Sequence, residues 1–91
     1  MKATIKATDL LDGKSIELEC SIRKDVNAAR ELMRVARANS RQIVRGISLT
    51  FGEAKLELIS YGRVIATGKM TNNVFAGGGN IEAKECVPYA A

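Results

Sequence analysis

Residues 15–38 read SIELECSIRKDVNAARELMRVARA, and the spacing of their apolar side chains changes near Asp25. Up to that point every second residue is apolar, as in a strand with one buried face: Ile16, Leu18, Cys20 and Ile22. Beyond it the apolar residues recur at the spacing of one helical face: Val26, Ala29, Leu32, Met33 and Ala36. The sequence therefore predicts a strand over 15–22 and then a helix that Asp25 caps and that ends near Asn39.

The segment before this stretch predicts a partner strand. Residues 2–8 alternate in the same way, and Asp12-Gly13, a dipeptide typical of tight turns, follows them. We therefore expect 2–8 and 15–22 to form a β-hairpin.

The segments after the helix predict an antiparallel meander. Strands are expected over 42–51, 54–60 and 64–70, with a turn at 51–53. A candidate last strand over 81–87 would end at Pro88 or lie at a sheet edge. We thus expect an α+β fold for a single domain of residues 1–91: an antiparallel sheet of five to six strands with one helix packed on one face, in the order β-β-α-β-β-β with a candidate C-terminal sixth strand.

The composition argues against most catalytic and metal chemistry. The chain has no histidine, and its two cysteines, Cys20 and Cys86, lie far apart in the sequence. It has no nucleophile elbow, phosphate-binding loop or dinucleotide fingerprint. We expect a protein that is not an enzyme, with no catalytic residues, metal or cofactor.

No apolar run is long enough for a signal peptide or a membrane span, and two cysteines do not suggest a disulfide scaffold. We therefore expect a cytoplasmic protein that does not bind a membrane.

The positive charge is concentrated in one stretch. Residues 23–45 hold seven basic and two acidic residues, a net charge of +5, whereas the rest of the chain has a net charge of −1. The helix would carry Arg30, Arg34 and Arg37 on one face, together with Arg41 if it continues that far, and Arg45 lies further along. Guanidinium groups bind phosphates and carboxylates bidentately, so these five arginines are the predicted contacts to an anionic partner.

A second predicted contact is Phe75, in the segment from Gly68 to Asn80. Asparagines and a glycine triplet predict a long loop there, and such loops are often functional. Phe75 would then be an apolar anchor for a partner, unless Val74 and Phe75 fold back and cap the core.

These features favour a small regulatory or inhibitory binding protein whose arginines contact the acidic surface of another protein. A small α+β protein that is basic on one face and has no catalytic motif is typical of accessory proteins of phages and mobile elements, which often sequester or inhibit a host component. One alternative is nonspecific binding to the nucleic acid backbone, and another is a self-assembling protein that forms homo-oligomers through its edge strands. A fourth interpretation needs no partner: the arginines form a solvated outer face or pair with glutamates of the same chain.

Overall fold

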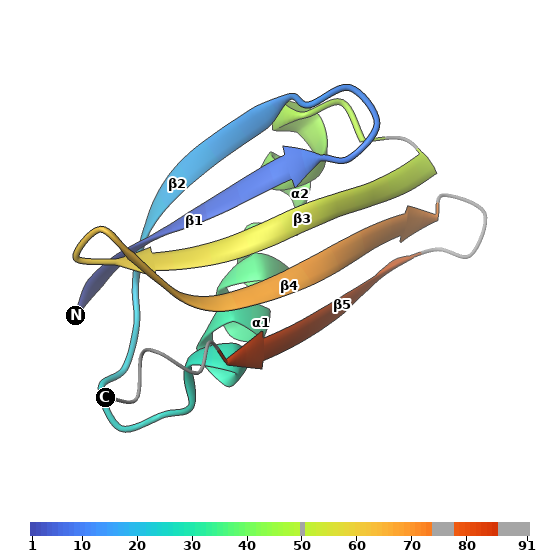
Figure 1. Cartoon of the computed structure of the whole chain (residues 1–91). Helices are drawn as coiled ribbons and strands as arrows, with labels where there is room; N and C mark the ends of the chain where they lie inside the picture. Colours follow the sequence, from blue (N-terminus) through green and yellow to red (C-terminus); the bar gives the residue numbers. More distant parts are fainter. Residues whose placement is uncertain (50, 74–77, 86–91) are drawn as a thin grey trace.

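The computed structural model describes residues 1–49, 51–73 and 78–85. Five strands and two helices follow one another along the chain (Figure 1): β1 (Lys2–Asp9), β2 (Ser15–Ser21), α1 (Ala28–Ala38), α2 (Ser40–Gly46), β3 (Phe51–Ser60), β4 (Arg63–Asn73) and β5 (Gly78–Glu85). The predicted α+β class is confirmed, but the expectation of a single helix is wrong because α2 follows α1.

All the strands pair antiparallel in the order β2-β1-β3-β4-β5, so β2 and β5 form the two edges. Both helices lie behind the sheet in Figure 1 and cover the same face. Helix α1 packs mainly over β4 and β5, and α2 reaches β2. The helix pair therefore crosses the sheet from one edge to the other.

Alternation along the strands gives the sheet a helix-facing side and an open side. In β1 the odd-numbered residues from Ala3 to Asp9 are buried, and the even-numbered residues between them are exposed or half-buried. The largest fully buried apolar side chains are Ile5, Leu32, Ile43, Ile47, Leu56, Leu58 and Ile65. Each such side chain stabilises the fold by about 1.5–3 kcal/mol relative to an exposed one, so this layer is the main source of stability.

Helix α1 begins at Asn27, not at the predicted cap Asp25. The Asn27 side-chain oxygen accepts hydrogen bonds from the amides of Ala29, at 2.8 Å, and Arg30, at 3.4 Å. Asparagine and aspartate cap helices equally well, so composition alone did not decide between the two positions.

The predicted strand over 42–51 is wrong in its first half, which forms α2. Ile43 and Ile47 are four residues apart, a spacing that places them on one face of a strand or of a helix, and both are buried. A left-handed residue, Ser48 with φ of 53°, ends the helix. The Ser48 amide donates to the Arg45 carbonyl at 3.3 Å and the Leu49 amide to the Val44 carbonyl at 2.9 Å, which is a Schellman motif.

Two predicted interruptions of the sheet are also wrong. The turn expected at 51–53 is the start of β3, and most of the loop expected over 68–80 is strand. β4 continues to Asn73, which pairs with Gly78 of β5. Backbone groups make this ladder, so asparagine and glycine take part although both are poor strand formers. Phe75 lies outside the described residues.

Replacing Ser48 by glycine tests the Schellman motif. A left-handed residue with a β-carbon is strained, so Ser48→Gly is expected to raise the free energy of unfolding by about 1 kcal/mol in urea titrations. If residue 48 were instead part of a strand, Ser48→Gly would lower the free energy of unfolding, because glycine weakens strands.

Gly46 tests the packing of α2 on β2. A β-carbon at Gly46 would lie 2.7 Å from Cδ1 and 2.8 Å from Cγ2 of Ile16. Gly46→Ala is therefore expected to lower the free energy of unfolding by about 1–3 kcal/mol, the usual effect of overpacking. The loss should shrink in an Ile16→Ala background, where the obstructing atoms are gone.

Gly52→Ala is the matched control for Gly46→Ala, because its β-carbon would meet only Leu49 Cδ1, at an ordinary 3.6 Å. Its stability should stay within about 0.5 kcal/mol of the parent. Equal losses at Gly46 and Gly52 would contradict the packing described here.

Candidate functional site: the arginine surface and its buried glutamate

A buried carboxylate organises the basic side of the molecule. Glu31 lies on the buried face of α1, and its side chain is only 1% exposed. Its Oε1 accepts from the Arg23 side-chain Nε at 2.6 Å and from the Arg23 amide at 3.2 Å. Its Oε2 accepts from Arg34 Nε at 2.7 Å. We call this group the glutamate clamp.

The glutamate clamp joins α1 to the end of β2. Arg34 Nη2 donates to the Ser21 carbonyl at 2.9 Å, and Arg23 lies just beyond that strand. The clamp therefore fixes α1 against the β2 edge, whereas the helix as a whole lies mainly over β4 and β5. Among the described residues no buried side-chain nitrogen or oxygen lacks a hydrogen-bond partner.

Opposing effects set the charge of Glu31. Burial alone would raise its pKa, but the hydrogen bonds from Arg23 and Arg34 outweigh burial and hold the pKa below its ordinary value. Glu31 is therefore ionised at neutral pH. One negative charge is shared by two guanidinium groups, so the clamp as a whole keeps a net charge of +1.

The five predicted arginines all lie exposed on the helical layer, and we call them the arginine surface: Arg30, Arg34, Arg37, Arg41 and Arg45. Helix α1 brings the first three together around a shallow hollow in which Met33 is half-buried. Arg41 and Arg45 belong to α2, beyond the junction at Asn39, and not to a continuation of the first helix. The prediction of one continuous helical stripe therefore holds only for α1.

Most of the arginine surface has no acidic partner. Within the described ranges the ion pairs are Lys14–Asp12 and Lys69–Glu53 in addition to the glutamate clamp. Arg34 is thus the only member of the surface that pairs within the described part of the chain. The intramolecular-pairing interpretation applies to Arg34, and Arg30, Arg37, Arg41 and Arg45 keep charges that no described carboxylate neutralises.

The open side of the sheet carries a different pattern of charge. Lys6 of β1 lies between Glu17 of β2 and Glu57 of β3 in the strand register. Lys69 of β4 pairs with Glu53 of β3 at 3.2 Å. Acidic and basic side chains are thus interspersed on the described part of this side, although one lysine of β3 lies directly opposite Lys69 in the register. The concentrated positive charge is confined to the helical side.

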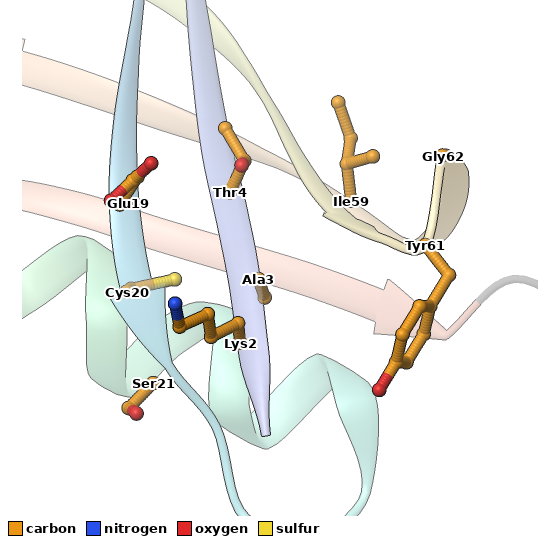
Figure 2. Close-up of a pocket in the computed structure, with 9 residues that line it drawn as sticks. All are labelled: Lys2, Ala3, Thr4, Glu19, Cys20, Ser21, Ile59, Tyr61 and Gly62. Carbon is orange, nitrogen blue, oxygen red and sulfur yellow. The ribbon is translucent and has the colours of Figure 1, made fainter.

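The open side also has a hollow of about 430 Å³ beside the β3–β4 turn (Figure 2). Figure 2 shows the Lys2 side chain extending toward β2 and the Tyr61 ring standing at the opposite margin. The hollow is lined by Lys2, Ala3, Thr4, Glu19, Cys20, Ser21, Ile59, Tyr61 and Gly62. One lysine and one glutamate among these residues give the hollow no net charge.

Cys20 supplies no activated nucleophile to this hollow. Burial raises the pKa of its thiol, and the charge of Arg34 opposes that effect only in part. The thiol is therefore protonated at neutral pH, and a thiol is a much weaker nucleophile than a thiolate. In the described residues we find no cluster of three or more side chains of the types His, Cys, Asp and Glu that could bind a metal ion. No helix in this part of the chain is both long and apolar enough to span a membrane.

Sequence reasoning missed three components of these sites. Arg23 was counted only as charge, because its contact with Glu31 depends on how the chain turns between β2 and α1. Met33 was assigned to the apolar face but lies among the arginines. Tyr61 is 90% exposed in a tight turn. The adjacent Gly62 indicates that turn, but nothing in the sequence indicates that Tyr61 lines the hollow.

The glutamate clamp predicts a specific pH dependence. Glu31→Gln places an amide group against an arginine donor and should lower the free energy of unfolding at pH 7 by about 2 kcal/mol. The folded-state pKa of Glu31 is lowered, so its contribution is present above the unfolded value near 4.5 and is lost as the pH falls through the folded-state value. Urea titrations between pH 7 and pH 3 should therefore show a shallower decline for Glu31→Gln than for the parent.

The control is Glu19→Gln, an exposed glutamate of β2 that forms no ion pair among the described residues. This variant should remain within about 0.5 kcal/mol of the parent and keep the parent's pH dependence. A Glu31→Gln variant with unchanged stability at pH 7 would show that the clamp does not stabilise the fold.

The chain matches no protein-family model, and no curated protein or solved structure is significantly similar to it. Inference about its function therefore depends on the charges and contacts of the molecule itself.

Proposed function

We propose that this chain is a non-catalytic binding protein that uses the arginine surface to bind an anionic partner. One observation carries the proposal: Arg30, Arg37, Arg41 and Arg45 are exposed on the helical layer and pair with no described carboxylate. The one acidic residue of the two helices, Glu31, is buried and already bound by Arg23 and Arg34.

The spacing of these charges supports the proposal. Arg30, Arg34 and Arg37 lie three and four residues apart on α1, and like charges at that spacing destabilise an isolated helix by a few tenths of a kcal/mol per pair, on the order of 0.2–0.5. An anionic partner would relieve this repulsion. A surface that serves solubility alone commonly mixes both signs, as the open side of the sheet does.

Self-association through β2 is a weaker alternative. A two-fold antiparallel pairing of two β2 edges about Leu18 would place Glu17 of one copy opposite Glu19 of the other. Like charges directly opposite one another destabilise a strand pair. The acidic side chains of β2 thus disfavour this route to a homo-oligomer.

Charge reversal on the arginine surface tests the proposal. The parent chain should bind immobilised polyglutamate or polyphosphate at 50 mM NaCl, and the affinity should fall as the salt concentration rises. Arg37→Glu/Arg41→Glu should weaken that binding at least tenfold, because it removes two contacts and adds two repulsions. Biolayer interferometry with both polymers measures the effect.

The matched control is Lys55→Glu/Arg63→Glu, which makes the same change in net charge at exposed positions away from the helices. Its affinity should stay within about threefold of the parent, since distant surface charges are screened. The proposal fails if the parent binds neither polymer, or if the control loses as much affinity as the helical variant.

A further inference from the structure

In the described part of the chain, the arginine surface has none of the exposed apolar anchors of a protein interface. Its apolar side chains, Met33 and Val44, are both half-buried. The exposed large hydrophobic residues in the described part of the chain are Leu10, Leu11 and Tyr61, all in turns between strands. Protein interfaces usually have an apolar or aromatic core, whereas surfaces that bind nucleic acid are more polar and more positively charged. The composition of the surface therefore favours phosphates over the acidic patch of a protein.

Among the residues that the structure describes, the surface also has no aromatic platform for unpaired bases. Neither α1 nor α2 contains an aromatic residue. Proteins that bind single strands combine positive charge with aromatic rings on which the bases stack. Tyr61 does not supply such a ring to this surface, because it lies in the β3–β4 turn beside the open-side hollow of Figure 2. The bases of the partner are thus expected to be paired.

The shape of the helical layer distinguishes between the two kinds of duplex. Helices α1 and α2 lie together on one face of the sheet (Figure 1), and their arginines are exposed to solvent. The surface extends at most about 22 Å from Arg30 to Arg45, at 1.5 Å per helical residue, which is long enough to meet several phosphates. The major groove of B-form DNA is about 12 Å wide and admits a helix, but the major groove of A-form RNA is narrow and deep.

We infer that the partner of the arginine surface is double-stranded DNA, which it binds through backbone phosphates with little dependence on base sequence. This inference rests on the proposed function. Arg30, Arg37, Arg41 and Arg45 would contact phosphates, with Met33 between the arginines of α1. Arg34 contributes less, because Glu31 and the Ser21 carbonyl already bind its Nε and Nη2.

Salt dependence gives the inference a quantitative test. Neutralising four phosphates predicts a slope of about −3.6 for the logarithm of the binding constant against the logarithm of the salt concentration. Between 50 and 300 mM NaCl the affinity should therefore fall by a factor of about 600. Each single replacement Arg30→Gln, Arg37→Gln, Arg41→Gln or Arg45→Gln should make the slope shallower by about 0.9, whereas Arg63→Gln should leave it unchanged.

The experiment is fluorescence anisotropy with the full chain and a labelled 20-base-pair DNA at four salt concentrations. Parallel arms use a second DNA duplex of unrelated sequence, either of its single strands, an RNA duplex of the same sequence, and unlabelled polyglutamate as a competitor. We expect equal affinity for the two DNA duplexes and at least fivefold weaker binding to the single strand and to the RNA. Circular dichroism of each variant checks that it is folded.

The outcomes separate this inference from the proposed function. Binding of polyglutamate without binding of DNA would overturn the inference and leave the proposed function standing in favour of an acidic protein. Equal or tighter binding to the single strand or the RNA duplex would also overturn it. A chain that binds neither DNA nor either anionic polymer would overturn both.

Discussion

The buried carboxylate of Glu31 is the constraint on which the basic side of this molecule depends. Without a partner, a buried negative charge would be strongly unfavourable. Arg23 and Arg34 make it favourable by donating to both oxygens, and Arg34 continues to the Ser21 carbonyl. The Arg23–Glu31 and Arg34–Ser21 contacts join α1 to the end of β2, whereas the Arg34–Glu31 pair lies within α1. The clamp therefore fixes α1 on the sheet. It also leaves no acidic side chain of the two helices free to pair with the other arginines.

That arrangement separates two kinds of surface. The open side of the sheet alternates Glu17, Lys6 and Glu57 across three strands, so its charges compensate one another locally. In the part of the chain that the structure describes, the helical side has no such ion pairs beyond the clamp. Because the two sides are separated by the sheet and its core, the carboxylates of the open side do not form ion pairs with the exposed arginines among the described residues. The net positive charge of the chain is thus concentrated on the helical face.

Sequence periodicity predicted the parts of the fold in which burial alone decides the structure. The alternation in β1 and β2 and the apolar face of α1 follow from which side chains must avoid water, whereas the turn at Asp12-Gly13 follows from a glycine that adopts a φ of 78°. It failed at 42–46, where the four-residue spacing of Ile43 and Ile47 fits a strand as well as a helix. In the structure a Schellman motif ends the helix after this segment, with Ser48 in the left-handed region. The sequence gives no strong signal for this conformation, since glycine is the usual residue there. Asn73 and Gly78 likewise look like loop residues but pair across two strands, because the ladder is made by the backbone.

The candidate site was predictable only as a set of exposed arginines. Their spacing predicted that Arg30, Arg34 and Arg37 share a face, and the structure brings these three together around one hollow. It did not predict that Glu31 is buried and also bound by Arg23, or that Arg34 reaches the Ser21 carbonyl, because these contacts depend on the path of the chain between Ser21 and Ala28. Two exposed arginines of the same helix can therefore have different roles. Arg34 stabilises the fold, and Arg37, one turn further along α1, retains the full charge available for a partner.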